Sequence, residues 1–537
     1  MTERRQRILA VCTRSGLGKG GLPVFNWQLC EALANNHSVT LLTTQPDTPP
    51  HEGVTVLHTP APPPMAGEGS EPWEERVWLE WCAQHDPRGF GLPGSHERPF
   101  DLIIGHSRFS GPAAAQLRER WYPDAKLAHF LHTSPEKLPY AKYPDAPQHA
   151  AFKAQRDLSL ELEFMGRSDI VIGVGPLLTN EADRVTSSVQ LKPSVHELIP
   201  GTQIDQPVTH GASQGRLNLL VMGRVDDPLK GVKDAAIAVN KLNEAGVSTH
   251  LTILGADAQT LAQAKEEFAA LAGAENVEVK AFIRDPNELR AEVRRADAVM
   301  MPSKHEGFGL VATEALGHGI PVLVNQESGA AQFLGDQNRI PASLGSPCIV
   351  QEPPPGVERA EMWVSAIADL KEDLPQRREA ALQLRQELQQ YSWENASESF
   401  IQVTREAVHI QERRTSQTRQ TSLTTVQGPA GTVLPSDAPK AQTADRQSST
   451  QAPVQETAHN KGPQARTQSQ QSPQPAGPMT VEQIAALRSA KMPNPAKRTA
   501  QQGTHGTQGT TVPRQSPMPH TRQGPGPTPG AGGAPGR

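Results

Sequence analysis

Two carboxylates eight residues apart are the clearest candidates for ligand chemistry. Glu306 lies in the segment SKHEGFGLVATEAL, directly after an apolar strand pattern, and Glu314 lies in the helix pattern that follows. If that helix begins at Gly307, Glu314 lies two turns along the same side, roughly 12 Å deeper. Carboxylate oxygens accept hydrogen bonds from paired hydroxyls, such as those of a hexose or a ribose. Gly307 and Gly309 also let backbone N–H groups at the helix start approach an anion.

Two cations follow an earlier strand pattern. Arg224 comes directly after the apolar run LNLLVM, and Lys230 ends the loop GRVDDPLKG at the start of the next helix pattern. Two cations at the mouth of a strand–helix turn are what a diphosphate needs when no metal neutralises it.

The elements that position these residues are strands and helices that alternate along the chain. In the first half, a buried strand, a glycine-rich loop, an amphipathic helix and a second strand form the opening of a doubly wound α/β domain. The same pattern restarts after Ile199-Pro200-Gly201. The ends of the predicted strands carry polar residues, and in such sheets the carboxyl ends line the ligand crevice. The predicted strands are 8–13, 38–43, 101–104, 128–131, 169–173, 217–222, 250–254, 277–281, 298–301 and 321–325.

The remaining segments complete the predicted organisation. Residues 47–97 are rich in Pro, Gly and Glu and predict a long loop with one amphipathic helix. One helix is expected over 310–317 and a single long one over 361–390. The predicted domains are a first Rossmann-like domain (1–200), a second Rossmann-like domain (201–390), a closing helix (391–412) and a tail (413–537).

Four segments of the second domain carry a family resemblance. They are GRVDDPLKG, LTILGAD, NVEVKAFIRDPNEL and ADAVMMPSKHEGFGLVATEALGHGIPVLVNQESG, in this order. Together they resemble the donor-binding half of the retaining GT-B glycosyltransferases of family 4, which include the glycogen, sucrose and mycothiol glycosyltransferases. The resemblance covers almost all of the second domain. It implies an α/β fold of two Rossmann-like doubly wound domains facing a cleft, with a disordered C-terminal tail.

The resemblance also implies roles in the transfer of a hexosyl group from a nucleotide sugar. Arg224 and Lys230 would hold the diphosphate and stabilise the leaving group. Glu306 would bind hydroxyls of the transferred sugar, and Glu314 would bind the ribose. Backbone groups of the next segment would cap the sugar and phosphates, and these belong to Gly307, Phe308, Gly309 and Leu310.

The first domain resembles the acceptor half more loosely. SGLGKGGLPVFNWQLCEAL is similar to the first strand–helix turn of the family, which implies that Gly20 and Gly21 approach the donor phosphates. DLIIGHSRFSGPAA and KLAHFLHTSPEKL resemble two strand ends where the family carries histidines. His132 matches the catalytic-region histidine that contacts the sugar near its C6 hydroxyl. Thr133 and Arg156 fall where some relatives hold a phosphorylated acceptor.

Two departures from the family pattern concern donor choice rather than the fold. The G-x-x-E pattern after the last strand is Gly329-Ala-Ala-Gln332, so the acidic side chain is replaced by an amide. The asparagine-glycine after the interdomain Ile-Pro is replaced by Gly201-Thr202. No metal and no cofactor other than the nucleotide-sugar co-substrate are expected, and the acceptor stays unidentified.

The composition of the chain argues against several other classes of protein. Residues 415–537 contain no Phe, Tyr or Trp, which predicts disorder, and the tail is a candidate for binding an unknown protein partner. The rest is acidic, which argues against nucleic-acid binding. Neither a signal peptide nor a membrane-span pattern is present, so a cytoplasmic protein is expected. The cysteines have no metal-ligand spacing, and they are Cys12, Cys30, Cys82 and Cys348.

Two other function classes remain open. Gly16, Gly18 and Gly21 fit the dinucleotide fingerprint, but the strand that should end in an acidic residue ends in Thr43-Thr44-Gln45. An NAD-dependent oxidoreductase is therefore the less favoured alternative. The other is a non-catalytic sensor or scaffold on the same fold, which the long tail favours and the four charged site residues oppose. Donor hydrolysis distinguishes this sensor or scaffold from an active transferase, because an active transferase also transfers some sugar to water.

Overall fold

The computed structural model describes residues 4–16, 20–46, 52–62, 74–97, 99–208, 215–407, 409 and 412. The chain divides into two units, Met1–Thr467 and Gln468–Arg537, and every described residue lies in the first unit. The tail from residue 413 onwards, with its predicted disorder and partner binding, lies outside the described residues.

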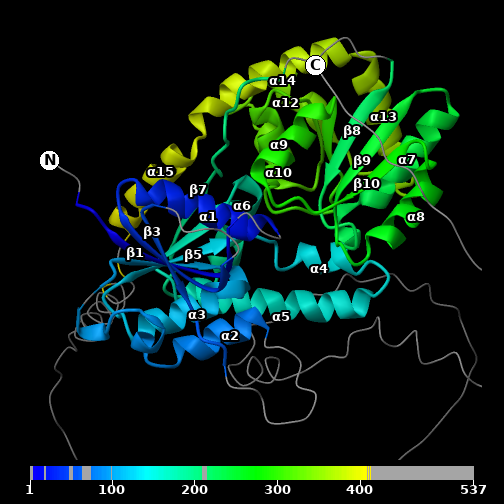
Figure 1. The fold of residues 1–537 in the computed structure, drawn as a ribbon. Coiled ribbons are helices and arrows are strands. Elements are labelled where there is room, and N and C mark those ends of the chain that lie inside the picture. Colours follow the sequence, from blue (N-terminus) through cyan, green and yellow to red (C-terminus); the bar gives the residue numbers. More distant parts are fainter. Residues whose placement is uncertain are drawn as a thin grey trace, which may run out of the picture. The chain divides into compact units, whose positions relative to one another are not determined.

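The first half of the described unit is built on a parallel sheet of seven strands (Figure 1). Their order is β3-β2-β1-β4-β5-β6-β7, so the chain reverses direction across the sheet between β1 and β4. A ligand crevice forms at such a switch point, beyond the carboxyl ends of the strands. The strands are β1 (Arg7–Ser15), β2 (Ser38–Pro46), β3 (Val54–His58), β4 (Leu102–His106), β5 (Lys126–Leu131), β6 (Ile170–Val174) and β7 (Ser194–Leu198).

The second half repeats this topology with six parallel strands. Their order is β10-β9-β8-β11-β12-β13, with the switch point between β8 and β11. Arg224 and Lys230 follow β8 and Glu306 follows β11, so the switch point collects the predicted donor residues. The strands are β8 (Leu217–Met222), β9 (Thr249–Ala256), β10 (Val277–Ala281), β11 (Ala298–Met301), β12 (Val322–Asn325) and β13 (Ile349–Val350).

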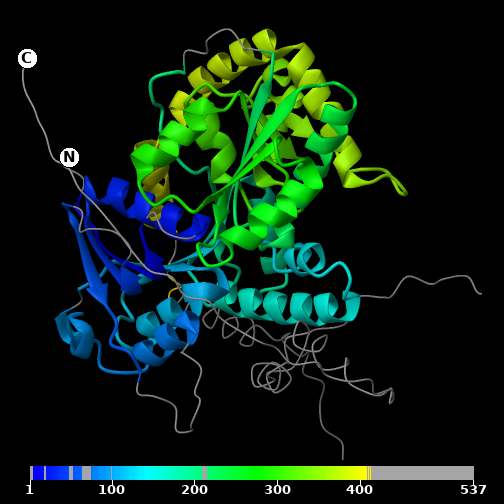
Figure 2. The ribbon, with the colours of Figure 1, turned by 45° about the vertical axis from the view of Figure 1, so that its right-hand side comes forward.

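Helices lie on both faces of each sheet (Figure 2), as parallel strands buried on both sides require. Those of the first half are α1 (Gly21–Ala34), α2 (Glu75–Ala83), α3 (Ser107–Arg120), α4 (Lys137–Lys142), α5 (Pro147–Gly166) and α6 (Pro176–Thr186). The others are α7 (Val232–Glu244), α8 (Leu261–Ala272), α9 (Pro286–Arg295), α10 (Leu310–Gly317), α11 (Gly329–Gly335), α12 (Ala342–Gly345), α13 (Arg359–Glu372), α14 (Leu374–Glu387) and α15 (Trp393–Glu406).

Two predictions about elements are wrong. The segment 47–97 was expected to hold only a loop and a helix, but Val54–His58 forms β3 and pairs with β2 at the edge of the first sheet. The expected single helix over 361–390 is two helices, α13 and α14, which meet at Asp373. Pro375 lies in the first turn of α14. Because proline lacks an N–H group and its ring clashes with the preceding turn, it suits a helix start and not a helix interior.

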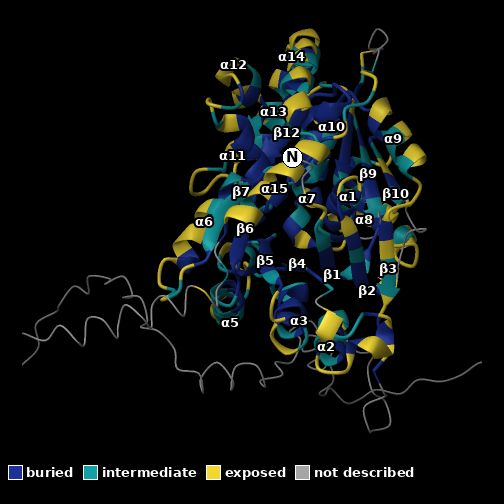
Figure 3. Ribbon diagram, turned by 90° about the vertical axis from the view of Figure 1, so that its left-hand side faces the viewer, coloured by how far each residue is buried: buried dark blue, intermediate teal, exposed yellow. Residues whose placement is uncertain are grey.

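The hydrophobic core is continuous between the halves. Phe130 of β5, Phe308 of the second half and Phe400 of α15 belong to one buried cluster, and the strands are buried while the outer helix faces are exposed (Figure 3). Helix α15 returns to the first half and lies along α1 (Figure 1). Its start is closely packed, since a Cβ atom on Gly201 would lie 2.3 Å from the backbone nitrogen of Trp393.

Two further findings concern the cysteines and the possibility of membrane-spanning helices among the described residues. The four cysteines are free and buried, as expected for the strand and helix thiols Cys12 and Cys30, and burial raises the pKa of Cys12 to about 12. No helix in the described ranges is both long enough and apolar enough to cross a membrane.

Candidate active site

The predicted donor loop runs from Ser303 to Gly309 between β11 and α10. The helix begins at Leu310 and not at Gly307, so the expected straight two-turn path from Glu306 to Glu314 is wrong. The reason is Gly309, whose φ of +100° is left-handed and interrupts the helical backbone. A Cβ atom there would also lie 2.5 Å from the sulfur of Met301.

The loop is held in place by the segment that follows β12. The N–H of Gly329 donates to the carbonyl of Glu306 at 3.1 Å, and the N–H of Ala330 donates to the carbonyl of Phe308 at 2.7 Å. The side chain of Phe308 is buried over Gly175, where a Cβ atom would lie 2.4 Å from its ring. The side chain of Phe308 is therefore not accessible to a ligand.

The structure brings Lys230 and Glu306 together. The Lys230 ammonium donates to Oε2 of Glu306 at 2.6 Å, and each side chain keeps 25% of its surface exposed. The guanidinium of Arg224 is more exposed and pairs instead with Asp227. Asp227 also caps the short 3₁₀ helix Pro228–Lys230, since its Oδ1 accepts from the N–H of Leu229 at 3.1 Å. Asp227 thereby fixes the backbone turn that carries Lys230, while the guanidinium of Arg224 lies exposed at the surface of the loop.

Glu314 lies in the middle of α10 and is half-buried. No hydrogen bond or ion pair joins its carboxylate to another described residue. Burial without a partner raises the pKa of Glu314 to about 6. An unpartnered carboxylate of this kind is suited to accepting hydrogen bonds from ligand hydroxyls. At the N-terminal end of the same helix, the first-turn N–H groups have no acceptor within the helix.

The donor loop touches the first half directly. A Cβ atom on Gly307 would lie 2.1 Å from the carbonyl oxygen of His132, at the end of β5. The ammonium of Lys137 pairs with Glu327 of the second half at 3.3 Å. Across the cleft, Gly20 has a φ of +111° and precedes α1, and nothing lies within 4 Å of a Cβ atom on Gly21. This open backbone leaves room for a ligand.

The ring of His132 is held by His106, the histidine of the other strand end that the sequence pointed to, and through it by Asn26, which the sequence did not single out. Its Nε2 lies 2.9 Å from Nδ1 of His106, and Nε2 of His106 lies 2.7 Å from Oδ1 of Asn26. Ser107 accepts a hydrogen bond from the backbone N–H of His132 at 2.9 Å. At +41° its φ is the one left-handed value among the described non-glycine residues, so the backbone is strained beside the site.

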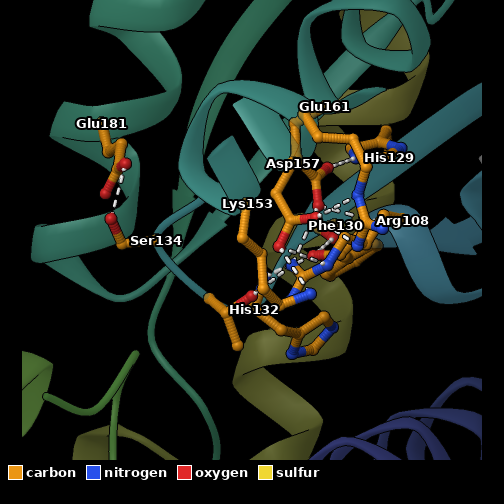
Figure 4. A network of polar contacts seen from close by, with 12 residues as sticks. Arg108, His129, Phe130, His132, Ser134, Lys153, Asp157, Glu161 and Glu181 are labelled. Carbon is orange, nitrogen blue, oxygen red and sulfur yellow. Dashed lines mark hydrogen bonds and ion pairs between the residues drawn. The ribbon is translucent and has the colours of Figure 1, made fainter. Parts of the chain in front are cut away.

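The predicted acceptor residues Thr133 and Arg156 contact a cluster of charges between α3 and α5. Figure 4 shows Arg108, Lys153 and Asp157 of this cluster. Arg108 donates to the hydroxyl of Thr133 at 3.0 Å and pairs with the fully buried Asp157 at 3.3 Å. Arg156 and Lys153 pair with the same carboxylate at 3.1 and 3.6 Å. Three cations therefore share one buried carboxylate. Burial lowers the pKa of Lys153, and Asp157 opposes that shift.

A second buried carboxylate completes this cluster. Glu161 accepts from the backbone N–H of Arg108 at 2.8 Å and lies 2.9 Å from Nε2 of His129 (Figure 4). His129 and Glu161 were missed by the sequence analysis. The available signal was the spacing of Asp157 and Glu161, which places both carboxylates on one face of a helix.

The described residues contain no group of three or more His, Cys, Asp or Glu side chains that could hold a metal ion. The expected lack of a metal and of a further cofactor stays a prediction. Gln332, the departure from the family pattern, is exposed on α11.

Two Rossmann-like parallel sheets, each with polar residues at the carboxyl ends of its strands, make the GT-B fold. Solved structures show the same fold. Sucrose-phosphate synthase from Thermosynechococcus elongatus has a TM-score of 0.56 at 21% identity and covers 75% of this chain and 98% of its own. The E. coli trehalose-6-phosphate protein bound with UDP-2-fluoro glucose has a TM-score of 0.52 at 15% identity, with coverages of 75% and 100%.

The sequence comparisons give the family. The model of the family 4 glycosyltransferases in conflict systems matches residues 9–400, and the chain belongs to this family. A D-inositol 3-phosphate glycosyltransferase of Xylanimonas cellulosilytica is 26% identical over 421 residues, which cover 72% of this chain and 92% of the relative. A glycogen synthase of Mycobacterium tuberculosis is 28% identical over 278 residues, with coverages of 47% and 64%.

Proposed function

We propose that this glycosyltransferase moves a hexosyl group from a nucleoside-diphosphate sugar to its acceptor with retention of anomeric configuration and without a bound metal. The observation that carries the proposal is the pair of Lys230 and Glu306 at the switch point of the second sheet. A cation and a carboxylate at one place match the two chemically different ends of the bond to be broken. They are the leaving diphosphate and the hydroxyl-rich sugar.

Each donor-side residue has a defined task in this proposal. Lys230 turns from Glu306 to the diphosphate, Arg224 joins it from the exposed loop, and both stabilise the charge that develops on the leaving group. Glu306, released from the ion pair, accepts hydrogen bonds from sugar hydroxyls. Glu314 binds the ribose, and the free N–H groups at the start of α10 face the phosphates.

The first half supplies the acceptor and one side of the sugar. The backbone carbonyl of His132 lies against Gly307 of the donor loop and its side chain is only half-buried, which supports a contact between its ring and the transferred sugar. We propose that the acceptor carries a phosphate group, held by Arg156, Thr133 and their neighbours Arg108 and Lys153. Three cations lie against the two buried carboxylates of Asp157 and Glu161, and this excess of positive charge supports the proposal, as does the phosphorylated acceptor in the printed name of the relative from Xylanimonas.

The test is a screen of the full chain against UDP-, GDP- and ADP-sugars, with thermal unfolding and donor hydrolysis as readouts. We expect one nucleotide to stabilise the protein and its sugar to be slowly hydrolysed, with both effects lost in Glu306→Ala and Lys230→Ala. Binding without turnover, even with phosphorylated polyols added, would favour the sensor or scaffold instead. If none of the donors binds, the proposed donor is wrong.

The acceptor is tested separately once a donor is known. Arg156→Ala should raise the KM for a phosphorylated acceptor and leave donor hydrolysis unchanged, because Arg156 has no contact with the donor loop. The matched control is Arg184→Ala, whose guanidinium is exposed and pairs with Glu136. Equal acceptor KM values for wild type and Arg156→Ala would contradict the phosphate site.

A further inference from the structure

Three side chains from three elements form a hydrogen-bonded row that ends at the proposed sugar-contacting residue. Asn26 lies in α1, His106 ends β4 and His132 follows β5. Asn26 and His106 are completely buried, and His132 is half-buried at the open end of the row. The joining distances are 2.7 Å between Asn26 and His106 and 2.9 Å between the two rings.

Asn26 is an unusual residue for its place. It lies on the otherwise apolar buried face of α1, and its Nδ2 has no partner among the described residues. A buried and unpaired amide donor costs about 1–3 kcal/mol. Placing Asn26 here to contact His106 therefore lowers folding stability, which indicates a functional reason for the residue.

The hydrogen bonds of the row determine which nitrogen of each histidine ring carries the proton. Burial lowers the pKa of His132 to about 3 and that of His106 well below its ordinary value, and the nearby His129 adds to both shifts. Both rings are therefore neutral, and each has one N–H donor and one acceptor nitrogen. Since Oδ1 of Asn26 only accepts, His106 donates from Nε2 and accepts at Nδ1. His132 must then donate from Nε2, which leaves a lone pair on its Nδ1.

The surroundings hold the two rings in place and add little charge. Phe25 meets the ring of His132 edge-on at 4.8 Å, and Phe130 lies 5.5 Å from the ring of His106. His129, next to both rings, is paired with Glu161 at 2.9 Å. Cys30 is 3.8 Å from Oδ1 of Asn26. Its thiol stays protonated because burial raises its pKa.

We propose that Asn26 and His106 are positioning residues, which hold His132 in the tautomer whose Nδ1 accepts a hydrogen bond from a hydroxyl of the transferred sugar. The inference rests on the proposed function for the role of His132. It goes further by naming the residues that set the tautomer and the nitrogen that faces the sugar.

The first test needs no donor. Nitrogen-15 NMR of the full chain labelled at histidine, with His132 assigned through His132→Gln, should show the Nε2–H tautomer in the wild type. Asn26→Leu, which keeps the size and removes the acceptor, should produce a mixture of tautomers. The control Asn243→Leu removes a well-bonded amide far away, at the end of α7, and should leave His132 unchanged. A wild-type Nδ1–H tautomer, or one unaffected by Asn26→Leu, would overturn the proposal.

The second test is kinetic and uses the UDP-, GDP- or ADP-sugar that the wild type hydrolyses. Asn26→Leu should lower kcat about 10- to 100-fold, with a KM within about twofold of wild type and an unchanged circular dichroism spectrum. An unchanged kcat would overturn the positioning role. If no donor is hydrolysed by the wild type, the proposed function fails, while the NMR result still decides the tautomer.

The pH profile of Asn26→Asp tests the positioning role, because it would match that of the wild type if Asn26 and His106 had a purely structural role. The introduced carboxylate still accepts from His106, so activity should be kept at high pH. It also raises the pKa of His106, and below that pKa the ring donates from both nitrogens and forces His132 into the other tautomer. At saturating donor, activity should therefore fall more steeply on the acid side than that of the wild type. Identical pH profiles for the two proteins would contradict the proposed row.

Discussion

At the scale of single residues, two charged side chains of the proposed donor site pair with each other in the free protein. The ammonium of Lys230 and the carboxylate of Glu306 are each other's partners, and both remain a quarter exposed. A bound donor therefore replaces the ion pair of Lys230 and Glu306 with two new interactions. Lys230 binds the phosphates, and Glu306 accepts hydrogen bonds from the sugar hydroxyls. Such a pair keeps two half-buried charges ready without leaving either unpaired.

Removing the cation should cost catalysis more than stability. Lys230→Ala is expected to lower kcat/KM for donor hydrolysis by about 100- to 1,000-fold, because the leaving diphosphate loses a preorganised charge. Steady-state kinetics measure this. The control is Lys233→Ala, one turn along, whose side chain is 61% exposed and pairs with Glu267. Similar kinetics for the two variants would exclude Lys230 from the donor site.

The unpartnered Glu314 predicts a pH dependence with a definite sign. Its folded pKa, about 6, exceeds the ordinary 4.5, so the folded state loses stability as the pH rises between these values. Glu314→Gln should raise the free energy of unfolding by about 1–2 kcal/mol near neutral pH and leave it unchanged below about pH 4. Donor affinity should fall near neutral pH because the charged acceptor is lost.

Chemical unfolding at the two pH values, with and without donor, measures both effects of Glu314→Gln. Glu266→Gln on the exposed face of α8 is the control and should change neither quantity. A stability gain of the same size at both pH values would show that the charge of Glu314 is not its cause.

At the scale of elements, the loop before α10 works because glycine lets it lie against β5. Gly307 meets the carbonyl of His132, and Gly329 meets Gly307 in turn, with a Cβ-to-oxygen distance of 2.1 Å at each contact. Three segments from different parts of the chain thus meet with almost no side chain between them. The positions of Glu306 and His132 are coupled by this contact.

Gly307→Ala should separate the loop from β5. The backbone of Gly307 is not left-handed, so the effect comes from the overlap of the new methyl group with the His132 carbonyl. We expect a loss of about 1–3 kcal/mol in stability together with lower donor turnover. Gly89→Ala has nothing within 4 Å of the new methyl group and should be nearly neutral. Wild-type stability in Gly307→Ala would contradict the close contact.

Helix α5 carries the charges of the acceptor side. Asp157→Asn leaves Arg108, Lys153 and Arg156 without their shared buried carboxylate, and we expect a loss of about 3–5 kcal/mol. Inorganic phosphate should restore more stability to this variant than to the wild type, because it can replace the missing anion. Thermal unfolding with and without phosphate measures this, and an equal response would argue against an anion site.

At the scale of the whole described unit, α15 ties the halves together. The chain completes the second sheet and then returns to the first, where Phe400 packs edge-on to Phe130 at 5.1 Å and Trp393 to Phe25 at 5.3 Å. Lys126 also donates to the carbonyl of Thr404 at 2.7 Å. This return crossing makes one continuous core of the two halves.

Phe400→Ala should lower the free energy of unfolding by about 3–5 kcal/mol, because the side chain is 1% exposed and leaves a cavity in the shared core. Denaturant unfolding measures the loss. Gln402→Ala, exposed on the same helix, should change stability by less than about 0.5 kcal/mol. A comparably small change in Phe400→Ala would show that α15 is not part of the core.

The sequence by itself determined most of the second half, because strand and helix periods are local properties. The expected strands 277–281 and 298–301 and the helix 310–317 are confirmed residue by residue. The strand β3 was missed because its five residues stand within a segment rich in proline and glycine. The helical path from Glu306 to Glu314 was wrong because only the structure shows that Gly309 is left-handed and that the helix does not extend back to Gly307.

Only the tertiary structure decided which side chains meet. Asn26 and His106 are 80 residues apart, and Lys137 and Glu327 are 190 apart. Their contacts depend on the order of strands in each sheet and on the docking of one sheet against the other, which no local pattern encodes. The residue types that do chemistry could therefore be found in the sequence, whereas their hydrogen-bond partners, burial and protonation are set by the packing of distant segments.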